Sequence, residues 1–264
     1  MDRFSVIGAG RVGLNLSQAL QKRGFHLQHI FKKALNNQYP AHITNNISKL
    51  VQDSDFIFIC VQESKIGPLA ELVSTKTAPL GKIFFHTANS LTSDELLPLR
   101  LAGAAVASFS PLQTFIRFHE DEELFSGVTF LLEGDEAAVR LARRIAVQLQ
   151  ARVLAVPKHD KVYFHMAAIA AANFLIANLK FAERQLNRTA ARPGLDILFP
   201  LVEQTFHNIK KYGWQKSLSG PLKRGETGLL KKHESLLSGS EKKIYRLLLR
   251  YLQENSDDLF IRSG

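Results

Sequence analysis

The sequence predicts an α/β fold in which a mostly parallel sheet is followed by an all-helical domain. Two observations support this prediction: short apolar runs alternate with helical patterns as far as Pro157, and a long helical pattern begins directly after it. Strands that alternate with helices along a chain form parallel sheets with helices on both faces. We therefore expect a first domain over residues 1–157 and a helical domain over residues 158–264.

The chain opens with an apolar run, Phe4 to Ile7, which is followed at once by a glycine-rich turn and then by a helical pattern. This order is typical of a dinucleotide-binding βαβ unit of the Rossmann type. One glycine makes a tight turn, one lets the backbone approach the pyrophosphate, and one lets helix and strand pack closely. Amides at the start of the helix then face the phosphates. We expect these residues to bind a dinucleotide, with an ordinary turn as the alternative: Gly8, Ala9, Gly10, Arg11, Val12 and Gly13.

The residues after the second predicted strand, Phe25 to Phe31, indicate which dinucleotide is bound. An NAD site has an acidic residue near the end of this strand that accepts hydrogen bonds from the ribose 2′-hydroxyl. Here Lys32 and Lys33 follow the strand, and no acidic residue occurs from position 3 to position 52. Cationic side chains pair with a 2′-phosphate that a carboxylate would repel. We expect Lys32, Lys33 and Arg11 to select NADP(H) over NAD(H). Two solvated loop lysines, or loss of the nucleotide site, are the alternatives.

Further apolar runs predict the remaining strands, and the patterns between them predict helices. The strand runs cover residues 41–44, 56–61, 82–86, 104–109, 128–132 and 152–156, and the helices cover residues 14–23, 47–52, 66–72 and 136–149. Ligands of parallel sheets bind beyond the carboxyl ends of the strands. The residues at these ends are therefore candidates, for the cofactor Val61, Gln62 and Thr87, and for the substrate His86 and Ser110.

Beyond Pro157, residues from Lys158 to Thr189 include no proline or glycine and predict one long helix. Its centre, Met166 to Ala177, is apolar nearly all round, which is typical of a buried helix. Further helices are expected over residues 197–212 and 240–254, with a loop over residues 217–226 between them.

Polar residues within the long helix are candidates for catalysis, because burying them costs free energy unless they are hydrogen-bonded or functional. His165 and Asn173 lie eight residues apart, about 80° apart around the helix axis, and Lys161 is one turn before His165. An imidazole pKa of about 6.5 suits protonation of a carbonyl or imine during hydride transfer, and Asn173 would orient the same atom. Hydrogen bonds between core helices are the alternative.

The predicted loop of the helical domain offers two substrate-binding candidates. Arg224 presents a forked donor that suits a carboxylate or phosphate, and His233 follows on the next helix. A helix-connecting turn with an exposed arginine is the alternative.

Composition bounds the class of protein. The 264-residue chain is 45% hydrophobic and 22% charged, as in globular proteins, and its one cysteine, Cys60, lies in an apolar run. We therefore expect no disulfide framework and no metal site, since no pair of histidines has helix spacing with a neighbouring carboxylate. The chain begins with a core strand, and no uninterrupted apolar run approaches about 18 residues. These features predict no cleaved signal, no membrane span and a cytoplasmic location.

The net charge of +10 is unevenly distributed, with 16 basic and 14 acidic residues through Pro157 and 18 basic and 10 acidic residues after it. A basic patch can bind nucleic acid. These charges, however, are scattered Lys-Lys and Lys-Arg pairs without aromatic platforms or a reading motif, which is typical of solvated helices. We do not expect a nucleic-acid partner, and one or two of the charges can serve an anionic substrate.

The chain as a whole resembles a family of two-domain bacterial proteins known as domain of unknown function 2520. The matching stretches are Gly8 to Gly13, His86-Thr87, Pro111 to Phe115, Leu132 to Asp135, Phe164-His165, Asn173, Leu218 to Gly225 and His233. The family is similar to deazaflavin-dependent NADP oxidoreductases, pyrroline-5-carboxylate reductases and 6-phosphogluconate-type dehydrogenases. This resemblance implies NADP-linked redox chemistry and a homodimer formed through the helical domain. The chain departs from the family pattern at Ala88-Asn89 (usually Ser-Gly), at Ser110 (commonly His) and at Gln62 (often Pro).

Together these observations predict an NADPH-dependent reductase of a small, anionic carbonyl or imine compound that binds in a cleft between the domains. A non-catalytic NADP(H)-binding sensor or scaffold is the alternative, supported by the departures at Ala88-Asn89 and Ser110. A nucleic-acid binder is a third and weaker alternative.

Overall fold

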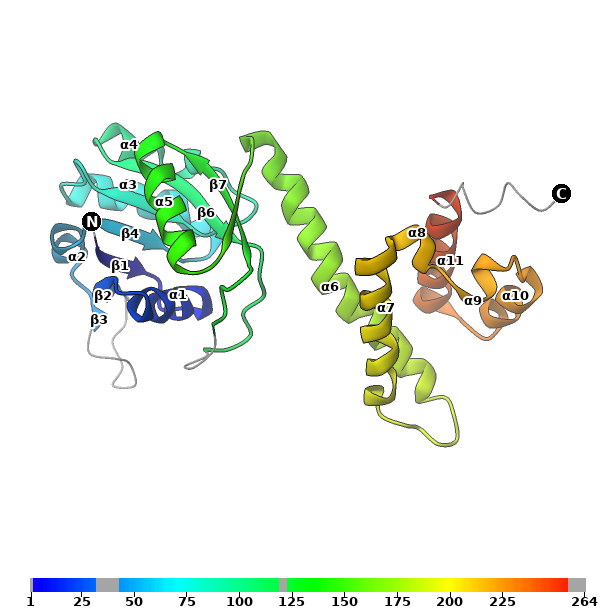
Figure 1. Cartoon of the computed structure of the whole chain (residues 1–264). Helices are drawn as coiled ribbons and strands as arrows, with labels where there is room; N and C mark the ends of the chain where they lie inside the picture. The colour runs from blue at the N-terminus through cyan, green and yellow to red at the C-terminus, as the bar shows by residue number, and fades with distance from the viewer. Residues whose placement is uncertain (1, 32–42, 119–122, 256–264) are drawn as a thin grey trace. The chain divides into compact units, whose positions relative to one another are not determined.

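The computed structural model describes residues 2–31, 43–118 and 123–255 (Figure 1). Contacts between residues divide the chain into two compact units, Met1–Asn173 and Phe174–Gly264. The division lies inside the long helix α6 (Lys161–Leu186), so the first turns of this helix belong with the sheet. Lys32 and Lys33, the predicted 2′-phosphate ligands, lie outside the described residues.

The first unit is built on one eight-stranded sheet with the order β3-β2-β1-β4-β5-β6-β7-β8. The strands are β1 (Arg3–Ile7), β2 (His26–Phe31), β3 (Ile43–Thr44), β4 (Phe56–Ile59), β5 (Ile83–His86), β6 (Ala105–Pro111), β7 (Thr129–Gly134) and β8 (Arg152–Ala155). Only β6 and β7 pair antiparallel, so the predicted mostly parallel sheet is confirmed. The order 3-2-1-4-5-6 is that of dinucleotide-binding sheets. From β1 the strands are added toward one edge and from β4 toward the other, so the strand order reverses between β1 and β4.

Helices cover both faces of this sheet (Figure 1). On one face, α1 (Arg11–Lys22) and α5 (Glu136–Gln148) bury Leu16, Leu20 and Ile145 against a row of phenylalanines that includes Phe58 and Phe109. The other face carries α2 (Ile47–Asp53), α3 (Ile66–Lys76), the 3₁₀ helix η2 (Ser93–Leu96) and α4 (Leu97–Leu101). Strands sandwiched in this way are apolar on both sides, as the buried run Phe56–Ile59 shows.

After β8, every described element is helical. The 3₁₀ helix η3 (Lys158–Asp160) leads into α6, and the second unit continues through η4 (Leu195–Leu198), α7 (Phe199–Tyr212), α8 (Trp214–Ser217), α9 (Gly220–Lys223), α10 (Thr227–Ser235) and α11 (Gly239–Glu254). The segment predicted as a loop, residues 217–226, begins at the last residue of α8 and contains the single turn α9. Pro221 lies in the first turn of α9, where its fixed φ angle suits a helix start and no amide donor is needed.

The prediction of a buried centre for the long helix is wrong in the single chain. Phe174 and Ile176 are 63% and 68% exposed, and Lys161 is the one buried residue of α6. A helix that is apolar all round needs neighbours on every side, and the elements in the described ranges of the chain do not supply them. By length and composition alone, Lys158–Leu186 is also apolar enough to cross a membrane, a criterion that the core helices of globular proteins meet as well.

Candidate functional site

The glycine turn after β1 has the backbone geometry expected of a phosphate-binding loop. Gly8 has φ +117°, and a Cβ atom there would lie 2.4 Å from the carbonyl oxygen of Cys60. A Cβ atom on Gly13 would lie 2.1 Å from the carbonyl oxygen of Gly8. At Gly10, by contrast, a Cβ atom would meet nothing within 4 Å. Two glycines are therefore required by packing, whereas the third leaves the backbone open to a ligand.

The start of α1 is suited to an anion. The helix begins at Arg11 after Gly10, no side chain caps its N-terminus, and its first turn has no acidic residue. The first amides of a helix lack intrahelical acceptors and carry partial positive charge. A diphosphate placed over Gly10 would therefore find free donors and the exposed Arg11 side chain.

A cavity of about 540 Å³ lies beside this turn, at the carboxyl ends of the strands where the sheet order reverses. It is largely apolar and is lined by Ile7, Gly8, Ala9, Phe31, Val61, Ser64, Lys65, Pro68, Leu69 and Leu72. A site of this size and position can hold an adenosine moiety. Lys65 is an exposed cation at the cavity that our sequence reasoning missed, although it follows the same strand end as the predicted Val61 and Gln62.

Asn15 brings a second arginine to the start of α1. Its side chain is 2% exposed, and Nδ2 donates to the carbonyl oxygens of Arg11 at 2.8 Å and of Arg117 at 3.0 Å. The segment after β6 is thereby held against the first turn of α1. Arg117 is exposed, and among the described residues no carboxylate pairs with it or with Arg11. A buried polar residue inside an amphipathic helix was the one sequence signal for this contact.

The remaining cofactor candidate, Thr87, is partly exposed after β5 and lies near the thiol of Cys60. Burial raises the pKa of the Cys60 thiol to about 12, so it stays protonated and serves packing.

Lys161, at the start of α6, is completely buried against the end of β6. Its ammonium donates to the hydroxyl of Ser108 and, at 3.4 Å, to the hydroxyl of Ser110. Burial lowers the pKa of Lys161 to about 8, and the charges of Glu133 and Glu63 limit this fall. The structure therefore brings together two predicted site residues, Lys161 and Ser110.

Glu133 supplies a buried negative charge near Lys161 that the sequence did not reveal. Strand pairing places Glu133 opposite Ser108, and its two oxygens accept from the amide of Ser93 at 2.5 Å and the hydroxyl of Ser93 at 2.7 Å. Only the antiparallel register of β6 and β7 produces this arrangement, so no local pattern could have predicted it.

His86 is held inside its own loop. Its Nε2 lies 2.9 Å from the carbonyl oxygen of Thr92, which can only accept, and the amide of Ala88 donates to Nδ1 at 3.3 Å. The ring is therefore a neutral Nε2–H tautomer. Burial, together with the charge of Lys161, lowers the pKa of His86 to about 4. In this structure His86 fixes the shape of the loop, and its role as a substrate ligand stays a prediction.

The two other catalytic candidates on α6 are less closely joined to Lys161. His165 lies one turn further along, and its Nδ1 is buried without a hydrogen-bond partner in the described part of the chain. Asn173 is exposed and lies about 18 Å along the helix from Lys161 at 1.5 Å per residue. Their catalytic roles stay predictions.

The substrate candidates of the second unit have partners within that unit. Arg224 forms an ion pair with Glu226, and Nδ1 of His233 lies 3.0 Å from the hydroxyl of Tyr245. Both are exposed, so each retains donors for a ligand.

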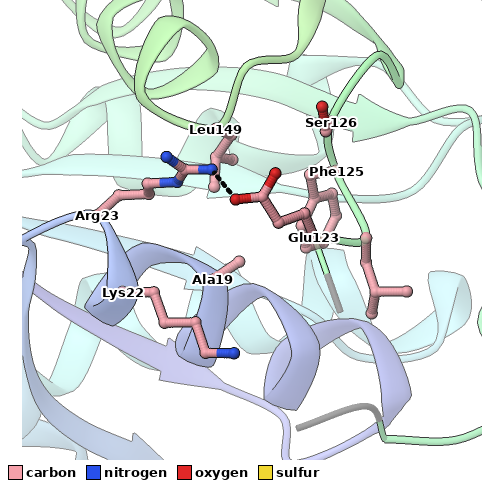
Figure 2. A pocket seen from close by; sticks show the side chains of 8 residues that line it. Ala19, Lys22, Arg23, Glu123, Phe125, Ser126 and Leu149 are labelled. Carbon is pink, nitrogen blue, oxygen red and sulfur yellow. Dashed lines mark hydrogen bonds and ion pairs between the residues drawn. The ribbon is translucent and has the colours of Figure 1, made fainter. Parts of the chain in front are cut away.

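A second hollow, of about 150 Å³, lies at the carboxyl end of α1 (Figure 2). Arg23 reaches across it to Glu123, with 2.7 Å between the nitrogen and the carboxylate oxygen, while Phe125 and Leu149 form its apolar wall (Figure 2). Because the arginine is neutralised and the hollow lies at the far end of α1 from the glycine turn, we interpret this hollow as a packing contact between α1 and the segment before β7. The described residues include no cluster of three potential metal ligands.

Solved structures with this fold include several nucleotide-dependent enzymes. A Bacteroides fragilis protein provisionally named as an NADP oxidoreductase has a TM-score of 0.80 and 20% identity over 96% of this chain and 98% of its own. The Aspergillus terreus reductive aminase, in complex with NADPH and ethyl levulinate, has a TM-score of 0.70 and 13% identity over 97% and 94%. Plasmodium falciparum pyrroline carboxylate reductase, with NADP bound, has a TM-score of 0.62 and 11% identity over 97% of both chains.

At these identities the likeness establishes a shared fold, a Rossmann-type sheet followed by a helical domain. No curated protein sequence matches the chain. Residues 128–252 match the family described as Domain of unknown function (DUF2520), and the resemblance inferred from the sequence motifs is thereby confirmed.

Proposed function

We propose that this protein is an NADP(H)-dependent oxidoreductase that reduces a small carbonyl or imine compound. The observation that carries the proposal is the open backbone at Gly10, placed between the uncapped start of α1 and the cavity at the strand switch point. NADP(H) is favoured over NAD(H) because Arg11, Arg117 and Lys65 are exposed cations around this site. Relatives of the same fold bind NADPH and NADP, which supports the choice.

NADPH, when bound, supplies a hydride. The chain would then supply a proton, and Lys161 is the group best suited to hold it. A pKa of about 8 keeps most of its amines protonated at pH 7, and the hydroxyls of Ser108 and Ser110 can pass the proton toward a ligand. The positive charge of Lys161 also supports an anionic substrate. Binding of that substrate between the two domains stays a prediction.

Titration of the purified protein with NADPH and NADH, followed by nicotinamide fluorescence, tests the cofactor. We expect NADPH to bind at least about tenfold more tightly, because one ion pair to the 2′-phosphate is worth at least about 1.4 kcal/mol. Lys32→Glu with Lys33→Glu should weaken NADPH far more than NADH. Absence of binding by both coenzymes at millimolar concentration would contradict the proposal.

A non-catalytic NADP(H) sensor is the second candidate, because the first unit holds His86 neutral inside its loop and buries Lys161 completely. It predicts tight NADPH binding with no oxidation of NADPH across a panel of cyclic imines, keto acids and ketones. Turnover of any of these compounds excludes the sensor.

We further propose that the protein is a cytoplasmic homodimer. The exposed apolar side chains of α6, α7 and α11, among them Phe174, Leu201 and Leu247, form more apolar surface than scattered residues would. A second copy that covers these helices would give α6 the burial that its sequence predicts.

A further inference from the structure

The loop that follows β5 holds polar atoms that the fold leaves without partners. Asn89 Oδ1 and Ser90 Oγ are buried and, within the described ranges, have no hydrogen-bond partner, and the same holds for His165 Nδ1. A buried acceptor without a partner has lost its hydration and gained no hydrogen bond in return, so such atoms in a native fold require a reason.

The orientation of the Asn89 amide identifies what is missing. Its Nδ2 donates to the carbonyl oxygen of Pro111 at 3.1 Å. Because a carbonyl oxygen can only accept, the atom that faces Pro111 must be the nitrogen, and the unpaired atom must be the oxygen. The Asn89 oxygen is an acceptor, and its missing partner is therefore a hydrogen-bond donor.

Hydrogen bonds link this loop to the Lys161 site. Pro111 directly follows Ser110, which accepts from Lys161, and His165 lies one helical turn beyond Lys161. The adenosine-sized cavity lies on the other side, at the ends of β1, β2 and β4. Since the two halves of a dinucleotide bind on either side of the switch point, the ends of β5 and β6 form the half where the reacting ring and substrate belong.

We propose that the Asn89 side-chain oxygen accepts a hydrogen bond from an N–H group of the ligand at the ends of β5 and β6. The inference rests on the proposed function. The N–H group is either the carboxamide of the nicotinamide or the nitrogen of an amine or iminium substrate. A ligand with an acetyl group in place of the carboxamide, or with an ether or ketone oxygen, leaves Asn89 unpaired.

The first arm of the test concerns the cofactor. Dissociation constants for NADP⁺ and for its 3-acetylpyridine analogue, which has a methyl group where nicotinamide has NH₂, are measured by calorimetry for the wild type and Asn89→Leu. If the carboxamide is the donor, Asn89→Leu raises the dissociation constant of NADP⁺ about tenfold and changes that of the analogue by less than about twofold. Asn208→Leu, at a partly exposed asparagine of α7 whose side chain accepts from Gln204, is the matched control and should change neither value.

The second arm concerns the substrate. With NADP⁺ saturating, cyclohexylamine and cyclohexanone, which has an acceptor oxygen and no donor, are titrated into the same proteins. If a substrate nitrogen is the donor, Asn89→Leu weakens the binding of cyclohexylamine about tenfold and leaves the dissociation constants of cyclohexanone and NADP⁺ unchanged.

A selective loss in either arm supports the proposal. Two outcomes overturn it even though NADP⁺ binds: an equal loss of affinity for both ligands of each pair, or an unchanged ratio of their dissociation constants in both arms. Asn89→Ala repeats both arms with a smaller side chain, so a folding defect specific to leucine does not decide the result. A wild type that binds no nucleotide overturns the proposed function and this inference together.

Discussion

Lys161 shows how strongly a single side chain depends on its surroundings. A solvated lysine holds its proton too firmly to act as an acid near neutrality, with a pKa of about 10.4. Here complete burial lowers the pKa to about 8, while Glu133 and Glu63 keep it from falling further. The ammonium is therefore still the main form at pH 7, and it gives up its proton more readily than a surface lysine does.

Lys161→Met removes this acid and retains an apolar stem of similar length. We expect kcat to fall by about 10²–10⁴-fold, the usual contribution of a general acid, with NADPH affinity retained. In the wild type, kcat should fall about tenfold per pH unit above pH 8 as Lys161 deprotonates, and the variant should lack this limb. Steady-state kinetics from pH 6 to 10 measure both. Lys180→Met, at an exposed lysine of α6, is the control, and an identical pH limb in Lys161→Met would contradict the assignment.

Substitutions at two positions of the glycine turn after β1 should affect stability and nucleotide binding separately. Gly13→Ala places a Cβ atom 2.1 Å from the carbonyl oxygen of Gly8. The free energy of unfolding, measured by thermal denaturation, should therefore fall by on the order of 3 kcal/mol. Gly10→Ala meets open space and should unfold at the wild-type temperature, yet bind NADPH at least about tenfold more weakly because the methyl group enters the ligand's approach. Wild-type affinity in Gly10→Ala would contradict a phosphate at this turn.

At the scale of elements, the contact between α1 and the segment after β6 has a direct consequence for binding. Both carbonyl oxygens that Asn15 holds lie within about 3 Å of the same nitrogen, so the backbones of Arg11 and Arg117 are close neighbours. Two arginines are thereby placed at the positive end of a helix that has no acidic first turn.

Arg117→Ala should weaken NADPH about tenfold, as expected for loss of one charge-assisted contact to phosphate. Asn15→Ala should produce a similar loss, because it releases the backbone that places Arg117. Fluorescence titration at two salt concentrations measures both. Arg23→Ala removes an arginine that Glu123 already neutralises and should leave the affinity unchanged. Equal losses of affinity in Arg117→Ala and Arg23→Ala, with none in Asn15→Ala, would mean that net charge alone matters.

In the molecule as a whole, α6 is the helix whose apolar sequence predicts burial but whose side chains are largely exposed. Stable dimers bury about 1,200–2,000 Å² in total, and the exposed apolar residues of α6, α7 and α11 are the surface that we propose for such an interface. Light scattering should therefore show a dimer. Phe174→Glu with Ile176→Glu should give monomers that still bind NADPH, because the nucleotide cavity is formed by the first unit. Leu80→Glu, at an exposed leucine of the first unit, should remain dimeric. A monomeric wild type, or one that partitions into lipid vesicles, would contradict the proposal.

Local patterns in the sequence predicted the strand–turn–helix opening, the alternation of strands and helices as far as Pro157, and the helical remainder. These features depend on periodicity and on backbone conformations that glycine adopts at little cost, so neighbouring residues reveal them. The contacts of Lys161 with Ser108 and Ser110, the position of Glu133 opposite Ser108, and the Asn89 oxygen that has no partner among the described residues became visible only in the folded chain. Each of these depends on the register of strands far apart in the chain and on the burial that results, and no local pattern specifies either.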